Sequence, residues 1–331
     1  MKVELNVFFF DASRDYLPHY RKFSLDVVGK VSDLLAAVKR ADEEFDYDEK
    51  QPLKINGTMV LPSSDLEKIV KAFGNELTIE PASKYRAIND LLIDESDFWS
   101  AWKLIEPYCT MEDRFFFASQ KDLHYASTTF EFDKSYIGDA VLVTVYRAIQ
   151  KGNPHKEELL RAISEDVSGL WSCEFEVGVF EGKDYTPEIE ELQKMANPPK
   201  VDFSEKLSYL FAKKKRVPVV ERLEGVPVAL YRADEAWLKE QGAQIIAYKK
   251  ADKKAGQSLV AFNPELAYKK GAAVLLDAMD SGAELFVTGT AEDARYFREN
   301  FGKFERASGR EIYLEIVALE ELQNMKLKES A

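Results

Sequence analysis

Residues 53–61 read Leu-Lys-Ile-Asn-Gly-Thr-Met-Val-Leu, in which Asn56 and Gly57 separate two short apolar runs. An Asn-Gly pair between such runs predicts the tight turn of a β-hairpin, because both residues accept positive φ angles. On the amino-terminal side of this hairpin, residues 1–10 alternate polar and apolar side chains, as a half-buried strand does. On its carboxyl-terminal side, residues 76–80 have the pattern of a closing strand.

A helix is expected between the first strand and the hairpin. After a second extended stretch at residues 22–28, Ser32 is a candidate N-cap. The apolar residues that follow it recur at helical spacing and would face a core. Two strands, one helix and further short strands in this order predict a β-grasp domain over residues 1–82.

Helical signals dominate the next part of the chain, residues 83–200. Apolar residues recur at helical spacing in three segments, Asp97–Ile105, Ile137–Gln150 and Lys156–Ile163. Pro187 suits the first turn of a further helix. The prolines in the stretch 197–200 end that helix and stiffen the chain. We therefore predict an all-α domain over residues 83–200.

Strand and helix signals alternate over residues 201–331, which predicts an α/β domain and makes the whole chain an α+β multidomain protein. The expected strands are Pro227–Tyr231, Ala243–Tyr248, Leu285–Val287 and Ile312–Ile316. The expected helices are Glu235–Gln241, a helix capped by Asn263 that runs to Ala278, and one that begins at Thr290 and ends at Gly302.

Composition limits the function classes. The formal charge of −13 argues against nucleic acid as a partner, because phosphate backbones bind clustered lysine and arginine. The basic run 213–216 is either a solvated linker or a contact for a membrane surface or an acidic partner. No apolar run is long enough to span a membrane, and the first residues do not read as a secretion signal. The cytoplasm is the expected location, with peripheral association at the inner face of a membrane left open.

Four segments in one order resemble the iron–sulfur subunit of succinate dehydrogenase and fumarate reductase. They are Lys54–Leu61, Leu77–Pro81, Asp90–Trp99 and Ile105–Tyr108. The resemblance implies that residues 1–82 form a β-grasp domain of the two-iron ferredoxin type. It also implies that residues 83–200 form a ferredoxin-like helical domain.

That family holds a two-iron cluster in its β-grasp domain with cysteines on both sides of the Ile-Asn-Gly turn. Counted from Ile55 without a gap, the four places fall on Glu43, Asp48, Gln51 and Ser63. Iron–sulfur clusters need soft thiolate ligands, so the resemblance implies a domain without its cluster. Glu43 and Asp48 then belong to a solvated acidic loop or bind a hard cation.

The helical domain has lost cysteines in the same way. Three segments of this domain resemble the parts of the family's sequence that lie next to its other iron–sulfur clusters. These segments are Tyr136–Ala140, Val145–Arg147 and Gly169–Phe175. The family's ligands precede the first of these, whereas Phe117–Asp133 contains no cysteine. Cys173 is either one surviving ligand or a small buried apolar residue, and Cys109 matches no ligand. His124 is either a packing residue or a ligand.

The last domain resembles the cysteine-rich domain found in heterodisulfide reductase. The similar segments are Phe262–Ala267, Gly282–Gly289 and Ile312–Leu322. Gapless counting places the family's cysteines at Asp252, Lys253, Thr290 and Asp293. Thr290 and Asp293 also have the spacing of a capping box at the start of a helix.

The chain has no glycine-rich phosphate loop, no nucleophile elbow and no zinc-protease motif. We therefore predict a non-catalytic, cluster-free structural subunit or assembly factor of a respiratory complex, with no cofactor and no catalytic, cofactor-binding or metal-binding residue. The resemblance implies a flavoprotein or a cysteine-rich subunit as partner. The alternative is an electron-transfer subunit with unrecognised ligands, to which Cys173 and His124 would contribute. An activity acquired by the last domain also stays open.

Overall fold

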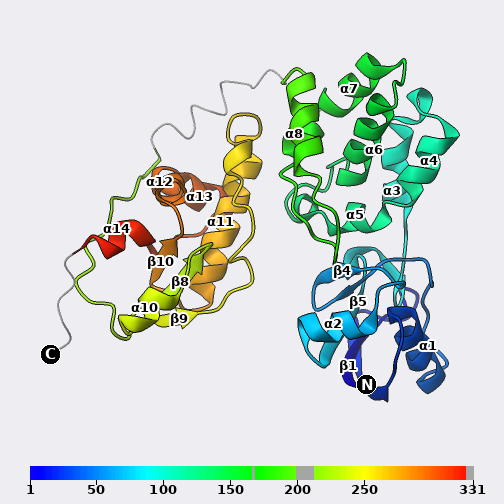
Figure 1. The fold of residues 1–331 in the computed structure, drawn as a ribbon, viewed down its shortest axis with the longest axis horizontal. Helices are drawn as coiled ribbons and strands as arrows, with labels where there is room; N and C mark the ends of the chain where they lie inside the picture. The colour runs from blue at the N-terminus through cyan, green and yellow to red at the C-terminus, as the bar shows by residue number, and fades with distance from the viewer. Residues whose placement is uncertain (166–167, 199–211, 326–331) are drawn as a thin grey trace. The chain divides into compact units, whose positions relative to one another are not determined.

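The computed structural model describes residues 1–165, 168–198 and 212–325 and shows an α+β protein (Figure 1). The chain divides into two compact units, Met1–Asn197 and Pro198–Ala331. Part of the stretch 197–200, where the sequence predicts a domain limit, lies outside the described residues, as do residues 326–331. The predicted limit at residue 82, inside the first unit, stays a prediction.

A mixed sheet forms the first part of the first unit. Its strands are β1 Lys2–Phe9, β2 His19–Asp26, β3 Leu53–Ile55, β4 Thr58–Val60 and β5 Glu76–Pro81. They lie in the order β2-β1-β5-β3-β4, with β1 parallel to β5 and the other neighbours antiparallel. The odd-numbered residues of β1 are buried in a core that includes helix α1, Val31–Ala41. The predicted turn is confirmed, since Asn56 and Gly57 have φ angles of 49° and 83°.

The expected N-cap of α1, Ser32, was wrong by two residues, because the N-cap is Lys30. The helix begins at Val31, so Ser32 lies inside it. The amide of Lys30 instead donates to Asp33 Oδ2 at 2.7 Å, and an acidic residue there also suits the positive end of the helix dipole. A further helix, α2 Leu66–Phe73, lies between β4 and β5 and is capped by Asp65.

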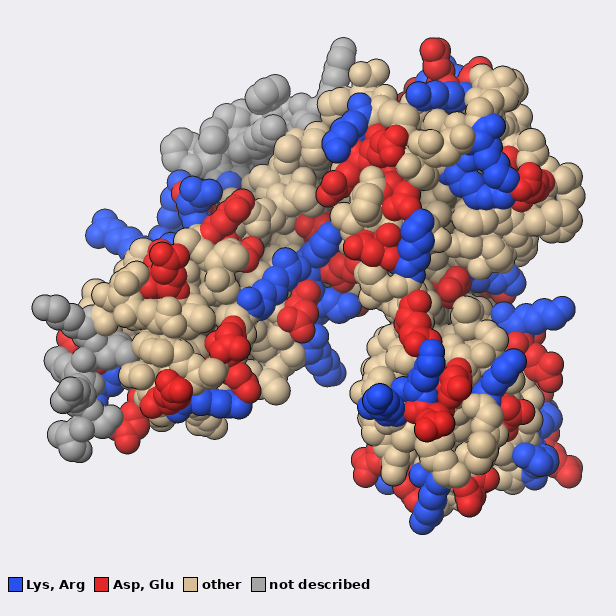
Figure 2. Space-filling view, viewed as in Figure 1, with Lys and Arg blue, Asp and Glu red and all other residues tan. Residues whose placement is uncertain are grey.

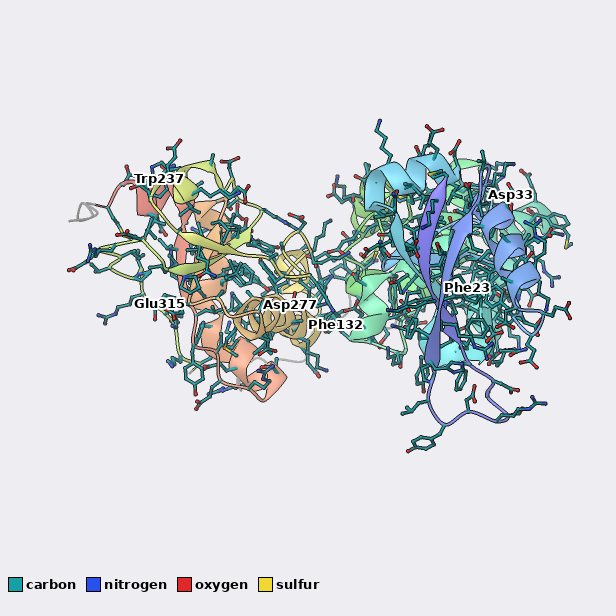
Figure 3. The ribbon with its side chains drawn as sticks, turned by 90° about the horizontal axis from the view of Figure 1, so that it is seen from below. Phe23, Asp33, Phe132, Trp237, Asp277 and Glu315 are labelled. Atoms are coloured by element: carbon teal, nitrogen blue, oxygen red, sulfur yellow. The ribbon has the colours of Figure 1, made fainter. Side chains whose placement is uncertain are left out.

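The two edges of this sheet differ. At the β4 edge, the chain closes the sheet with its own backbone: the Met59 amide donates to the Gly178 carbonyl at 3.1 Å. The Phe180 amide in turn donates to the Met59 carbonyl at 2.8 Å. At the other edge, β2 pairs only with β1 among the described strands. Figure 3 labels Phe23 on β2 and Asp33 at the start of α1.

The remainder of the first unit is mainly helical. Its helices are α3 Ser96–Lys103, α4 Met111–Ala118, α5 Lys121–Ala126, α6 Asp139–Gln150, α7 Lys156–Ser164 and α8 Thr186–Met195, with short 3₁₀ turns η1 Lys84–Arg86, η2 Glu106–Tyr108, η3 Thr128–Glu131 and η4 Leu170–Ser172. Pro187 lies in the first turn of α8, as predicted. The expectation of an all-α segment needs a correction, because a two-stranded sheet of β6 Ala87–Asn89 and β7 Leu92–Ile93 precedes the helices.

The second unit is built on a parallel sheet of four strands in the order β11-β10-β8-β9. Its elements are β8 Pro227–Tyr231, α10 Ala236–Glu240, β9 Gln244–Ile246, η5 Gln257–Leu259, α11 Pro264–Asp280, β10 Leu285–Thr288, α12 Ala291–Glu299, α13 Phe301–Ser308, β11 Glu315–Ala318 and α14 Leu319–Gln323. Alternate strand residues face opposite sides. Val228 packs with Leu238 and Leu322 of α10 and α14, whereas Phe286 packs against Phe297 of α12.

Two sequence expectations in the second unit were wrong in detail. Gly302 does not end a helix: α12 ends at Glu299, and Gly302 lies inside α13. A glycine at this position allows the backbone of Lys213 to pack against α13, because a Cβ atom there would lie 2.5 Å from the Lys213 amide nitrogen. The last strand begins at Glu315, later than the expected Ile312.

Positive and negative side chains are interspersed on the face shown in Figure 2. Within the basic run 213–216, Lys215 is tied to the second unit: its Nζ donates to the Leu314 carbonyl at 2.6 Å and pairs with Glu315 at 2.8 Å. Neither a solvated linker nor a free basic patch describes this lysine. None of the helices in the described ranges is both long and apolar enough to cross a membrane.

Candidate functional site

The places that correspond to the family's two-iron ligands do not come together as a metal site. Glu43, Asp48 and Ser63 are exposed, whereas the Gln51 side chain is buried. No group of three or more His, Cys, Asp or Glu side chains suited to a metal ion occurs within the described ranges. The loop between α1 and β3 is held instead by packing of Phe45, which is fully buried in the core of the first unit.

A buried carboxylate fixes this loop to the sheet. Asp90 Oδ1 accepts the Phe10 amide at 3.0 Å, and its Oδ2 accepts the Asp46 amide at 2.8 Å. The Asp90 amide donates to the Phe10 carbonyl at 2.7 Å, so the end of β1 is bound on both sides. Burial raises the pKa of the Asp90 carboxyl, an effect that the two backbone donors partly offset.

Asp46 extends the same network. Its Oδ2 accepts from Asn89 Nδ2 at 2.6 Å, and its Oδ1 pairs with Lys39 Nζ at 3.2 Å. The Leu91 amide donates to the Asp46 carbonyl at 3.2 Å. Sequence reasoning missed this network. The adjacent Asn89 and Asp90 were the available signal, because Asp accepts the positive φ of 45° found at residue 90.

His124 lies in the helical part of the first unit, inside an aromatic cluster. Its ring is 5.2 Å from that of Phe98, 5.0 Å from that of Tyr125 and 4.8 Å from that of Phe130. Its side chain is 1% exposed, and neither ring nitrogen has a hydrogen-bond partner among the described residues. Burial lowers the pKa of His124 to about 3, with a smaller contribution from Arg86. The structure therefore places His124 as a neutral packing residue.

Cys173 lies in a second buried polar group, at the start of α6. The Tyr136 hydroxyl donates to Asp139 Oδ1 at 2.6 Å, and Cys173 Sγ lies 3.5 Å from the same oxygen. All three side chains are buried. Burial is the main reason why the pKa of Tyr136 is raised well above its usual value, with Asp139 adding to it. Tyrosine and thiol thus serve as donors to a carboxylate rather than as ligands drawn together with other cysteines.

Cys109 is separate from this group and half-buried. Burial, followed by the negative charge of Asp113, raises the pKa of its thiol to about 12. The thiolate is the reactive form of cysteine, so this side chain is a poor nucleophile at neutral pH.

In the second unit, the four places counted in the sequence lie near the carboxyl ends of β8 and β10: Thr290 and Asp293 follow β10, and the backbone of Asp252 and Lys253 contacts Arg232 and Tyr231 at the end of β8. This is the edge where ligands bind in open α/β sheets, at the point where the strand order reverses. The Tyr231 hydroxyl donates to the Lys253 carbonyl at 2.8 Å, and Arg232 Nη2 lies 3.4 Å from the Asp252 carbonyl. Gly289 is packed so closely on the Arg232 carbonyl that a Cβ atom would overlap it. Main-chain and tyrosine contacts therefore hold residues 252–253 against this end of the sheet.

The N-cap predicted at Thr290 is confirmed, but Asp293 bonds the Thr290 hydroxyl rather than its amide, so the full capping box is not formed. Its Oγ1 accepts the Asp293 amide at 3.1 Å, and its hydroxyl donates to Asp293 Oδ2 at 2.7 Å. The two side chains begin α12 as an ordinary N-cap pair.

A shallow hollow of 410 Å³ lies elsewhere in the second unit, beside α13. Basic and acidic side chains line it together, among them Lys213, Arg310 and Glu311. Arg310 is already bound through both terminal nitrogens to Asp280, at 2.7 and 2.8 Å. The lining has no net preference for an anion or a cation.

Comparison with known proteins adds information on the fold. No family model matches the chain, and no curated protein matches it. A solved structure of a hypothetical protein from Helicobacter pylori is similar over 97% of this chain and 70% of its own, with 18% identity and a TM-score of 0.51. A chain of the Mycobacterium smegmatis Sdh1 complex in the apo form matches 59% of this chain and 96% of its own, with 14% identity and a TM-score of 0.41. The first likeness shows the fold alone, and the second is too distant to support more.

Proposed function

We propose that the protein is a non-catalytic, cluster-free structural or docking subunit, or an assembly factor, of a respiratory complex related to succinate dehydrogenase, fumarate reductase or heterodisulfide reductase. The observation that carries this proposal is the way the loop between α1 and β3 is fixed. Asp90 and Asp46 bind it to the sheet through backbone amides, and Phe45 fills the core beneath it. A loop held in this way keeps its shape without thiolate ligands.

The domain assignments belong to the same proposal. The strand order β2-β1-β5-β3-β4, in which β1 is parallel to β5, supports a β-grasp domain over residues 1–82. The helices of residues 83–200 would then be a ferredoxin-like domain, in which His124 and Cys173 pack where the family has cluster ligands. The parallel sheet of residues 201–331 supports a relationship to the cysteine-rich domain of heterodisulfide reductase.

Docking partners follow from this assignment. A protein that keeps the shape of an electron-transfer subunit and exchanges thiolates for packing residues would retain its contact surfaces. We therefore propose a flavoprotein or a cysteine-rich subunit as partner, with a cytoplasmic location that includes the inner face of the membrane.

An iron and acid-labile sulfide assay on the full chain, purified without oxygen, tests the cluster-free part. We expect far less than one iron per chain and no absorption bands in the visible range. Near-stoichiometric iron and sulfide would contradict the proposal and favour electron transfer through unrecognised ligands. Replacing Cys173 by Ser in such a sample would then show whether its thiol binds the iron.

Affinity purification of the full chain from native extract tests the docking part. We expect a flavoprotein dehydrogenase or a cysteine-rich subunit among the recovered proteins, and the same recovery from a Cys109→Ser/Cys173→Ser variant. If neither kind of subunit is enriched over an unrelated bait, the docking role is wrong.

A further inference from the structure

The outer edge of β2 carries backbone groups that no described strand uses. The Val27 amide donates to the Met1 carbonyl at 3.1 Å, which fixes the phase of the antiparallel β1–β2 ladder. Hydrogen-bonded and non-hydrogen-bonded residue pairs alternate along an antiparallel ladder. The amides and carbonyls of the odd-numbered residues of β2 therefore point toward β1. The amides and carbonyls of the even-numbered residues therefore face outward. These residues are Tyr20, Lys22, Ser24 and Asp26.

This edge lacks most of the usual protection against pairing. Exposed edge strands are normally short, bulged, interrupted by proline, charged or covered by another segment, and of these devices β2 has only charged side chains, among them Lys22 and Asp26. β2 spans eight residues, contains no proline and pairs with β1 in an unbroken register. The opposite edge at β4 is covered by the backbone of residues 178–180, so the same sheet protects one edge and leaves the other open.

The exposed side chains of β2 are also complementary in charge to those of a second, antiparallel copy of β2. Lys22 has no ion-pair partner within the described ranges, and Asp26 binds the Met1 amine through Oδ1 alone. An antiparallel copy of β2 centred on Ser24 sets Lys22 opposite the partner's Asp26. The same register sets Tyr20, 38% exposed, opposite the partner's Val28, which is 78% exposed. A register centred on Lys22 would instead oppose two like charges, which destabilises a strand pair.

The core-facing side chains of β2 also favour the register centred on Ser24. Phe23 and Leu25 are only partly buried at the margin of the core. Pairing centred on Ser24 brings Phe23 opposite the partner's Leu25 in a non-hydrogen-bonded pair, where side chains approach most closely. Each apolar side chain would thereby lose contact with water, which favours association.

We propose that β2 is the docking surface for a second copy of this chain. The two β2 strands pair antiparallel about a two-fold axis at Ser24, and their sheets join into one continuous sheet. This inference is independent of the proposed function. A single pair of eight-residue strands buries less surface than a permanent dimer needs, so the dimer is weak and depends on concentration.

Analytical ultracentrifugation of the full chain between about 1 µM and 0.5 mM tests the pairing, because weak interfaces dissociate in this range. We expect a reversible monomer–dimer equilibrium. Ser24→Pro removes an outward amide and no backbone bond to β1, so it should abolish the dimer. It also removes the 2.8 Å bond that the Ser24 hydroxyl donates to Glu4 Oε1 of β1, a loss that the control Ser24→Ala shares. The matched control Ser24→Ala keeps that amide and should dimerise like the parent chain. Circular dichroism and the thermal midpoint would show that both variants are folded.

A charge exchange tests the register without touching the backbone. Lys22→Asp opposes the partner's Asp26 and should weaken the dimer about tenfold or more. The double variant Lys22→Asp/Asp26→Lys restores the pair with opposite polarity, and its dimer should return to within about threefold of the parent. Amide hydrogen exchange should slow at Tyr20, Lys22 and Ser24 as concentration rises.

The proposal is overturned if the parent chain sediments as a monomer throughout that range. It is equally overturned if a dimer forms that neither Ser24→Pro nor Lys22→Asp weakens, because another surface then makes the contact. Failure of the double variant to restore the dimer would overturn the pairing centred on Ser24.

Discussion

The Asp90 carboxylate accepts two backbone hydrogen bonds at once, which an amide side chain with one oxygen cannot do in the same way. Its two carboxylate oxygens accept amides from the end of β1 and from the loop after α1, segments that lie far apart in the sequence. Hydrogen bonds to a charged acceptor contribute more than neutral ones, about 1.5 to 3 kcal/mol. The favourable bonds oppose the penalty of burying the charge, which is visible in the raised pKa of this carboxyl.

We expect Asp90→Asn to lower the free energy of unfolding of the first unit by about 1 to 3 kcal/mol. An amide has one oxygen, so one of the two backbone donors loses its acceptor and faces an NH₂ group. Urea unfolding followed by circular dichroism measures the effect, and hydrogen exchange at residues 42–51 localises it. Asp48→Asn, an exposed change in the same loop, should leave stability within about 0.5 kcal/mol. Equal stability of the two variants would contradict a structural role for Asp90.

His124 makes the stability of the first unit depend on pH. Its pKa is about 3 in the folded protein and 6.5 in the absence of the fold. Between these values the unfolded chain binds a proton that the folded chain does not, so stability is lost as pH falls from about 6.5 toward 3. Above 6.5 the imidazole is neutral in both states and contributes no pH dependence.

The variant His124→Leu should remove this component. Over the same pH range, the slope of unfolding free energy against pH should decrease by up to about 1.4 kcal/mol per pH unit, the value for one proton. Urea unfolding at a series of pH values provides the slope. His155→Gln, at an exposed position, is the matched control and should keep the parent slope. A slope unchanged in His124→Leu would show that the imidazole gains its proton without unfolding.

At the scale of elements, the start of α6 depends on a glycine. Gly138 precedes the helix with a φ of 90°, and a Cβ atom there would overlap His124 Nδ1. The glycine thus allows the helix to approach the aromatic cluster around His124. Gly74 has a similar φ of 82° at the end of α2 but open space around it. Comparing substitutions at Gly138 and Gly74 therefore separates the effect of backbone strain, present at both, from that of crowding, present only at Gly138.

We expect Gly138→Ala to destabilise the first unit by at least about 2 kcal/mol, through strain and overlap together. Gly74→Ala, the strain-only control, should lose about 1 to 2 kcal/mol. Thermal or urea unfolding of both variants gives the difference. Equal losses would show that the imidazole moves aside without resistance.

Helices α12 and α14 of the second unit are joined by a nearly buried ion pair. Arg298 is 8% exposed, and its terminal nitrogens donate to the two Glu321 oxygens at 2.6 and 2.8 Å. The hydrogen bonds from Arg298 are the main cause of the lowered pKa of Glu321. This stabilisation is present above the ordinary pKa of glutamate and is lost as pH falls through the lowered value.

We expect Arg298→Met to lower the stability of the second unit by about 2 to 4 kcal/mol, because it leaves Glu321 without its partner. Arg310→Met, which breaks the exposed pair with Asp280, is the control and should change stability far less than Arg298→Met, because water screens that pair. Urea unfolding at pH 7 measures both. The double variant Arg298→Met/Glu321→Leu should recover part of the loss, and no recovery would show that the arginine acts mainly through its bond to the Ile316 carbonyl.

Over the whole molecule, the local patterns of the sequence predicted most elements but not their tertiary ties. Asn56-Gly57, Pro187 and Thr290 marked a turn and two helix starts correctly, since each acts on backbone within three residues of itself. The boundaries at Ser32 and Gly302 were wrong, because contacts from Asp33 and Lys213 decide them. Gapless counting from Ile55 placed three of its four positions, Glu43, Asp48 and Gln51, in the loop between α1 and β3. It could not reveal Asp90, whose partners Phe10 and Asp46 are distant in the sequence.

The carboxylate of Asp90 also bears on how this chain matures. If the chain is cluster-free, as proposed, a loop fastened by its own polypeptide is complete once translation and folding end, and no scaffold protein has to deliver an inorganic centre to it. We therefore expect native folding of the first unit in iron-starved cells and in the presence of chelators or air.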